Sequence, residues 1–203
     1  EKQDFHVIPT DTISISIDKD AVLRSGIMLP DSIRHLKGKE LKNAIPDKIY
    51  ISLKDMRILT KVDMLMLEML ANCNWERPLY MAISVGEVSK LKFDHYFVQE
   101  GLAFRFTPFD YKKWGNVKGD NNYAIDVERL YENVMNRYKY GGLDTPGLYL
   151  DETTLRTCYY HRRLFAQLAK ELIRQGDNTR ARKVLAYAEQ AVPAYNVPEI
   201  YES

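Results

Sequence analysis

Two short stretches of the sequence hold side chains that could bind a ligand or a partner. One leads into a predicted strand. The other lies within a predicted helix, where two rings, an imidazole and two guanidinium groups fall within about one and a half turns. Rings beside cationic groups suit contact with a protein or a glycan. Core packing and solvated basic faces use the same residue types, and both interpretations stay open at this stage. The candidate binding residues are Trp75, Arg77, Tyr80, Tyr159, Tyr160, His161, Arg162 and Arg163.

Spacings typical of metal sites and catalytic sites are missing from the sequence. No HxH, HxxxH or CxxC pattern occurs among its histidines and cysteines. A GxSxG nucleophile motif is absent, and Gly86 stands alone at a predicted turn where a phosphate-binding loop would need several glycines. We therefore predict no catalytic residue, no metal and no cofactor. The scattered histidines are His6, His35, His95 and His161.

Two pairs of neighbouring carboxylates are better explained as helix caps than as general acids and bases. Asp18 with Asp20, and Asp151 with Glu152, stand at predicted helix starts. Carboxylates at that place cap free N–H groups and interact favourably with the helix dipole. A glycosidase-like pair would need two carboxyl groups about 5–10 Å apart across a cleft. We therefore predict that these acids are caps.

The balance of charges argues against nucleic acid as a partner. The chain has 29 basic and 28 acidic side chains, and 45% of its residues are hydrophobic, as in ordinary globular domains. No stretch reaches the roughly 20 apolar residues of a membrane span. The chain begins at Glu1 instead of a methionine, so we expect it to be part of a longer protein. Cys73 and Cys158 are expected to be free thiols, with one disulfide as the alternative.

The first half of the chain, residues 1–110, is predicted to be a small α/β domain. After an arm at 1–11, alternating side chains predict a strand at 12–17 that could join the edge of the main sheet. Residues 48–109 then alternate strands and helices, which favours a mostly parallel sheet with flanking helices. The predicted strands there are 48–53, 79–84 and 102–107, and the predicted helices are 61–73, which is apolar nearly all round and expected to be buried, and 87–99.

The second half, residues 111–203, is predicted to be helical. A helix follows the cap Asp126 and is stopped by Gly141-Gly142, and the longest helix begins after the second acid pair. The hairpin at 153–193 has the spacing of large and small residues found in a tetratricopeptide repeat. A plain helical hairpin would show much the same pattern, and this alternative stays open. The matching positions are Phe165, Leu168, Ala169 and Leu172 in the first helix and Ala181, Leu185, Ala188 and Pro193 in the second.

Three stretches, taken together, resemble one protein family. They are 74–83 (NWERPLYMAI), 96–108 (YFVQEGLAFRFTP), and 136–143 (NRYKYGGL) followed by 150–152 (LDE). They look like the C-terminal soluble region of multi-pass membrane proteins common in Bacteroidetes. Those proteins are related to the protein O-mannosyltransferases, which have a GT-C type membrane core. The resemblance extends over most of the chain after residue 47.

The resemblance implies a location and a role. Glycosyl transfer is expected in the membrane-embedded part of such proteins, so no catalytic residue is carried over to this chain. The chain would lie on the periplasmic face of the inner membrane, tethered through a membrane-spanning N-terminal part of the same protein. It would be a non-catalytic domain that binds or positions a protein or glycan acceptor or a lipid-linked sugar, or that stabilises the membrane-embedded core.

Two other functions stay open. An independent small α/β enzyme would have its site where the strands end, near 84–86 and 107–108, because ligands of open α/β sheets favour that edge. A tetratricopeptide-like scaffold would bind a protein partner and would have further helical repeats.

Overall fold

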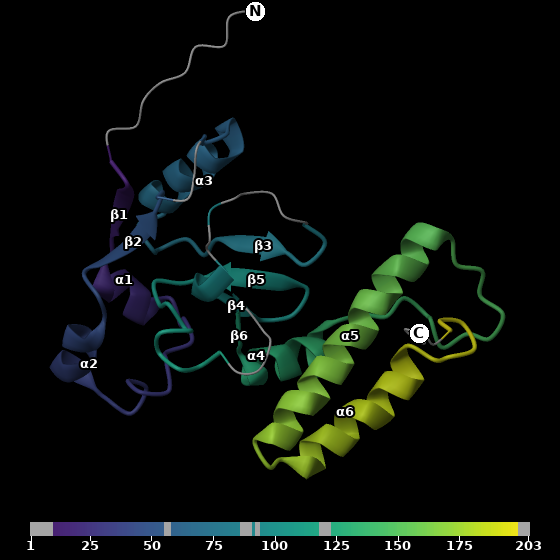
Figure 1. Cartoon of the computed structure of the whole chain (residues 1–203). Coiled ribbons are helices and arrows are strands. Elements are labelled where there is room, and N and C mark those ends of the chain that lie inside the picture. The colour runs from purple at the N-terminus through teal and green to yellow at the C-terminus, as the bar shows by residue number, and fades with distance from the viewer. Residues whose placement is uncertain (1–9, 55–57, 86–90, 92–93, 118–122, 199–203) are drawn as a thin grey trace, which may run out of the picture. The chain divides into compact units, whose positions relative to one another are not determined.

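The computed structural model describes residues 10–54, 58–85, 91, 94–117 and 123–198 (Figure 1). These residues form two small sheets and six α-helices, which confirms a mixed α/β fold. The chain divides into two compact units. Unit 1 comprises residues 1–81, 85–98 and 105–124, and unit 2 comprises residues 82–84, 99–104 and 125–203.

Strands β1 (Thr12–Ser16) and β2 (Lys48–Ser52) form a two-stranded antiparallel sheet in unit 1. Alternate side chains face the core, and Ile15, Ile49 and Ile51 are 4%, 3% and 5% exposed. Both strands form within their predicted ranges, 12–17 and 48–53. The pair is a sheet of its own, and β1 does not join the larger sheet as we considered.

Two short helices belong to the same unit. They are α1 (Lys19–Arg24) and α2 (Gly38–Ala44). The carboxylate of Asp18 accepts the Ala21 N–H at 3.0 Å and so caps α1, as predicted.

The larger sheet has the strand order β3-β5-β4-β6. Its strands are β3 (Tyr80–Ala82), β4 (Phe97–Gln99), β5 (Ala103–Phe106) and β6 (Ala124–Ile125). The backbone hydrogen bonds on both sides of β5 join residues whose numbers rise on one strand as they fall on the other, which is the antiparallel pattern. These bonds run from Ile83 to Leu102, from Phe106 to Leu79, from Glu100 to Ala103 and from Thr107 to Tyr96.

The prediction of a mostly parallel sheet is wrong, and the cause lies in the segment before Gly101. We expected a helix over 87–99, whereas its described end is a 3-10 turn, η1 (Asp94–Tyr96), followed directly by β4. Residues 100–102 alone then connect β4 to β5. Parallel strands need a crossover of about a dozen residues or more, so this connection allows only an antiparallel pair. Residues 86–90 and 92–93 of the predicted helix lie outside the described residues.

Helix α3 (Lys61–Asn72) forms where it was predicted, with a capping box between Thr60 and Asp63. The expectation that it is buried on all sides is wrong. Leu67 and Leu70 are buried, and the helix contacts β1. Its other apolar side chains are largely exposed, because a contact on one side covers only one face of a helix. These exposed residues are Val62, Met64, Leu65 and Met69.

Unit 2 contains the helices of the second half. Helix α4 (Val127–Glu132) continues as a π-helix, η2 (Asn133–Arg137), and α5 (Glu152–Arg174) and α6 (Asn178–Ala191) form a long hairpin (Figure 1). Aspartate side chains cap α4, α5 and α6 by accepting backbone N–H groups at 3.0, 3.0 and 2.9 Å. Two of these caps were predicted. The three caps are Asp126, Asp151 and Asp177.

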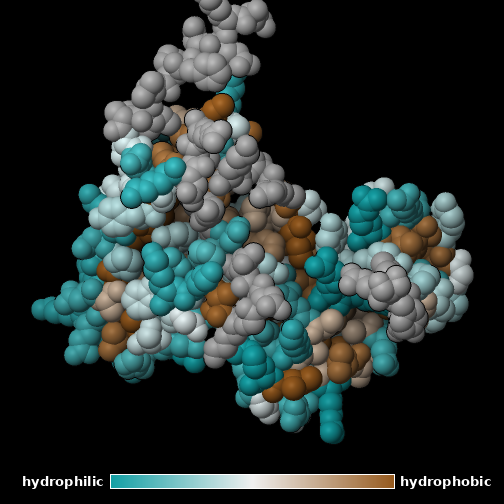
Figure 2. Space-filling view, in the orientation of Figure 1, coloured by the Kyte–Doolittle hydropathy of each residue, from teal (hydrophilic) through white to brown (hydrophobic). Residues whose placement is uncertain are grey.

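The hairpin is confirmed, whereas its tetratricopeptide character is not. Phe165, Leu168 and Ala169 of α5 are buried as that pattern requires. In α6, however, the pattern places Leu185 in the interface, and Leu185 is 47% exposed while Val184 is fully buried. Apolar patches are also visible among polar side chains over this hairpin (Figure 2).

Candidate ligand-binding site

Trp75, one of the predicted binding residues, lies in the core of unit 1. Its side chain is 5% exposed, its indole N–H donates to the Ser16 carbonyl at 2.9 Å, and its ring stacks on Phe106 with centroids 5.8 Å apart. Asn74 and Trp75 have φ of 49° and 62°, a left-handed conformation that turns the chain sharply after α3. The structure therefore gives Trp75 a packing role.

Arg77 and Tyr80 are exposed near Trp75. Arg77 lines a cavity of about 10 Å³, together with Cys73 and Trp75. That volume is about what one water molecule needs. This part of unit 1 therefore has a predicted aromatic and basic cluster but no room for a ligand at that cavity. Cys73, like Cys158, is a free thiol.

The second predicted group lies on α5 in unit 2, and His161 is its most distinctive member. The imidazole meets the rings of Tyr138 and Tyr140 edge to face, with centroids 5.7 and 5.2 Å away. Burial lowers the pKa of His161, because the apolar surroundings disfavour the charged form. Its Nδ1 atom is buried and has no hydrogen-bond partner in the described part of the chain.

The neighbours of His161 have separate roles. Arg162 donates to the Val192 carbonyl at 3.0 Å and so ties α5 to the residue that ends α6. Tyr159 is half-buried against the apolar core of unit 2. Tyr160 is half-buried and Arg163 is exposed. The sequence stretch is therefore a mixed face of one helix. None of its five residues lines the candidate pocket described next, although His161 lies against two tyrosines that do.

A pocket of about 430 Å³ opens in unit 2, beside the rings that surround His161. Ligand pockets of proteins commonly have such volumes. The pocket is lined by the π-helix, by the segment that follows it and by the C-terminal part of α6. The lining residues are Met135, Asn136, Tyr138, Lys139, Tyr140, Gly141, Gly142, Asp144, Tyr187, Gln190 and Ala191.

The wall of this pocket is held in place by hydrogen bonds. The Tyr140 hydroxyl donates to the Val134 carbonyl at 2.7 Å, and burial raises the pKa of Tyr140 so that this proton stays bound. The Tyr138 oxygen accepts the Leu102 N–H at 2.9 Å. Asn196 donates to the carbonyls on either side of Asp144, at 2.7 and 2.6 Å. The pocket is therefore preformed, which reduces the entropy cost of binding.

The turn between the two tyrosines and Asp144 depends on glycine. Gly141 and Gly142 have φ of 60° and 76°, in the left-handed region that side chains rarely adopt. From the sequence we interpreted these glycines only as a helix stop. The stretch Tyr138-Lys139-Tyr140-Gly141-Gly142 was nevertheless a usable signal, because two rings and a cation precede a turn that exposes backbone.

Three polar side chains of the pocket are not engaged elsewhere. Lys139, Asp144 and Gln190 make no side-chain hydrogen bond or ion pair within the described residues. They carry one positive charge, one negative charge and one amide, and so offer both donors and acceptors. Sequence reasoning did not select any of the three.

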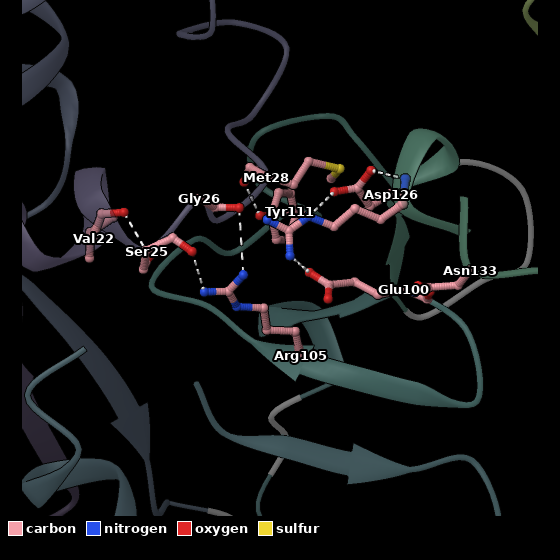
Figure 3. Close-up of polar contacts among 10 residues, drawn as sticks. Val22, Ser25, Gly26, Met28, Glu100, Arg105, Tyr111, Asp126 and Asn133 are labelled. Atoms are coloured by element: carbon pink, nitrogen blue, oxygen red, sulfur yellow. Dashed lines mark hydrogen bonds and ion pairs between the residues drawn. The ribbon is translucent and has the colours of Figure 1, made fainter. Parts of the chain in front are cut away.

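A second polar cluster of unit 2 is fully engaged in structure. Glu100 is 6% exposed and pairs with Arg129 at 3.1 Å, and the Asn133 amide donates to the Glu100 carbonyl at 2.6 Å (Figure 3). Arg129 also lies 3.5 Å from Asp126, whose pKa is raised by burial. These groups hold α4 to the β4–β5 turn. In unit 1, Arg105 similarly donates to the carbonyls of Ser25 and Gly26, at 2.8 and 3.5 Å (Figure 3).

No group of three or more His, Cys, Asp or Glu side chains within the described ranges could hold a metal ion. The helices that the structure describes include none of the length and apolar character needed to cross a bilayer.

Comparison with known proteins identifies the family. The family model of TMEM260-associated domain 2 matches residues 1–128, which is more than half of the 203 residues. No curated protein and no solved structure matched the chain. The chain therefore belongs to the TMEM260-associated domain 2 family.

Proposed function

We propose that this chain is a non-catalytic accessory domain of a TMEM260-like membrane protein and that it binds or positions an acceptor for glycosyl transfer. The family match supports the accessory role. The glycosyl-transfer role rests on the resemblance of three sequence stretches to proteins related to the protein O-mannosyltransferases. The chemistry is assigned to the membrane-embedded part of the parent protein.

The pocket of unit 2 is the observation that carries the binding role. It is preformed, it is large enough for part of an acceptor, and three of its polar side chains have no other partner in the described part of the chain. Binding sites typically combine apolar walls with a few polar groups that fix orientation. The acceptor is a protein segment or a glycan, and the tyrosines of the pocket suit either one.

The proposal includes a place in the cell and a partner. The domain lies on the periplasmic face of the inner membrane, tethered through a membrane-spanning region of the same protein. Its first partner is that membrane-embedded region, which receives the acceptor that the domain positions. This arrangement follows the resemblance, and the nearly balanced charges give no reason to add nucleic acid as a partner.

The strand directions remove the reason for proposing an independent enzyme. We placed its site near 84–86 and 107–108 because the ends of parallel strands meet at one edge of a sheet. In the observed sheet β5 is antiparallel to both β3 and β4, so consecutive strands end at opposite edges. The scaffold alternative is likewise set aside, because Leu185 does not occupy the position that the repeat pattern requires.

The test uses the full-length parent protein with three pocket substitutions combined, Lys139→Ala, Asp144→Ala and Gln190→Ala. We expect glycosylation of its acceptor, measured by mass spectrometry in cells, to fall because the acceptor is no longer held. The matched control is Lys170→Ala, an exposed lysine of α5 in the same unit. Equal glycosylation by the triple variant and the control, at equal protein levels, would refute the proposed role.

A further inference from the structure

The charges that line the pocket restrict what it can bind. Lys139 and Asp144 contribute one charge of each sign, and Gln190 is neutral. For an anion such as phosphate or carboxylate, the attraction by Lys139 is offset by the repulsion from Asp144, and for a cation the two effects are reversed. The pocket therefore has no preference for either sign of charge, and a neutral ligand fits this balance. It must still satisfy an ammonium that only donates, a carboxylate that only accepts and an amide that does both.

Tyr138 and Tyr140, two of the tyrosines that line the pocket, have hydroxyl groups engaged within unit 2. The Tyr140 hydroxyl donates to Val134, and the Tyr138 oxygen accepts from Leu102, both within unit 2. What Tyr138 and Tyr140 add to the pocket is therefore mainly ring surface. The pocket thus combines aromatic ring carbon with three polar side chains that have no partner among the described residues.

One class of ligand matches both features. A pyranose ring carries hydroxyl groups that each donate and accept a hydrogen bond, and it also has an apolar surface of C–H groups that packs on aromatic rings. It has no net charge. We propose that the pocket beside Tyr138 and Tyr140 binds a neutral hexopyranose unit through Lys139, Asp144 and Gln190. This inference rests on the proposed function, because it names the chemistry that the same pocket recognises.

The inference is tested by NMR on the 203-residue chain. The amide spectrum is titrated separately with the methyl glycosides of glucose, mannose, galactose and N-acetylglucosamine. Expected are saturable shifts in the segments 135–144 and 187–191 for at least one glycoside. Each of the substitutions Asp144→Asn and Gln190→Ala is expected to weaken binding about fivefold, equivalent to about 1 kcal/mol. Lys170→Ala is expected to bind like the wild type.

Two further probes separate this inference from the proposed function. Glucose 1-phosphate, a charged sugar, is expected to bind more weakly than the neutral glycosides, and tighter binding would overturn the neutral-sugar inference. An unglycosylated serine- and threonine-rich peptide represents a protein acceptor. Shifts in the pocket with this peptide and with none of the glycosides would overturn the sugar inference and support the proposed function. Absence of pocket shifts with every probe would overturn both.

Discussion

Gly101 provides the sharpest test of how the pocket is built. This residue lies in the β4–β5 turn with φ of 153°, and a Cβ atom placed on it would be 2.0 Å from the Tyr138 hydroxyl oxygen. Gly101→Ala therefore forces Tyr138 to move away from the Leu102 N–H, which it accepts at 2.9 Å. The alanine must also adopt a backbone conformation that essentially only glycine tolerates, and this strain costs a further amount of about 1–3 kcal/mol.

The expected loss for Gly101→Ala is the sum of two parts. The backbone strain adds about 2 kcal/mol, and a part-buried N–H left without its partner costs about 1–3 kcal/mol. The total of about 3–5 kcal/mol lowers the melting temperature by roughly 6–20 °C for a chain of this size. Tyr138→Phe alone loses only the hydrogen bond, so it is expected to cost about 1–3 kcal/mol.

The double variant separates the two parts. The double variant, Gly101→Ala with Tyr138→Phe, keeps the backbone strain at residue 101. Each single variant already loses the hydrogen bond between Leu102 and Tyr138, and the double variant loses that same bond a single time. Its destabilisation is therefore expected to be smaller than the sum of the single variants by about 1–3 kcal/mol. Urea unfolding followed by far-UV circular dichroism measures all three free energies. Strictly additive losses would show that Gly101 and Tyr138 do not meet, and would refute the described pocket wall.

Two other outcomes follow from unit 2. Val184→Ala is expected to destabilise the chain by about 1–3 kcal/mol, because the valine is fully buried. Leu185→Ala is expected to cost less than about 1 kcal/mol, because Leu185 is largely exposed. Thermal melts that rank the two variants in the reverse order would favour the tetratricopeptide packing instead. Burial lowers the pKa of His161 in the folded chain, so the unfolded chain binds a proton at this residue more readily. The free energy of unfolding is therefore unaffected by His161 above its unfolded-state pKa of about 6.5. It falls as the pH drops from there towards the lower folded-state pKa. The variant His161→Phe is expected to lose less stability than the wild type between pH 7 and pH 5 in urea titrations, and an equal loss would contradict the buried, neutral imidazole.

Features that depend on a few neighbouring residues were predictable from the sequence. Asp18, Asp126 and Asp151 cap helices as expected, because a cap is a hydrogen bond to an N–H only three residues away. The strand at 12–16 was equally clear from its alternating isoleucines. The family resemblance also came from local motifs, and the match over residues 1–128 supports it at the level of the TMEM260-related family.

Features that depend on how segments meet were not predictable. Phe97–Gln99 was assigned to a helix because helices and strands use the same apolar residues, and this one error reversed the predicted direction of the sheet. Helix α3 looked buried because its composition is apolar, but burial depends on what covers each face. The same limit explains why Leu185 was chosen over Val184.

The sequence by itself determined the helix caps and most of the elements, since short-range hydrogen bonds and side-chain periodicity decide them. Only the tertiary structure decided the pocket. Asp144 and Gln190 are far apart in the chain and carry no pattern that links them. They reach one cavity because α6 packs beside the glycine turn at Gly141 and Gly142. Their freedom to bind a ligand is likewise a property of the fold, since it depends on which partners the other polar groups have already taken.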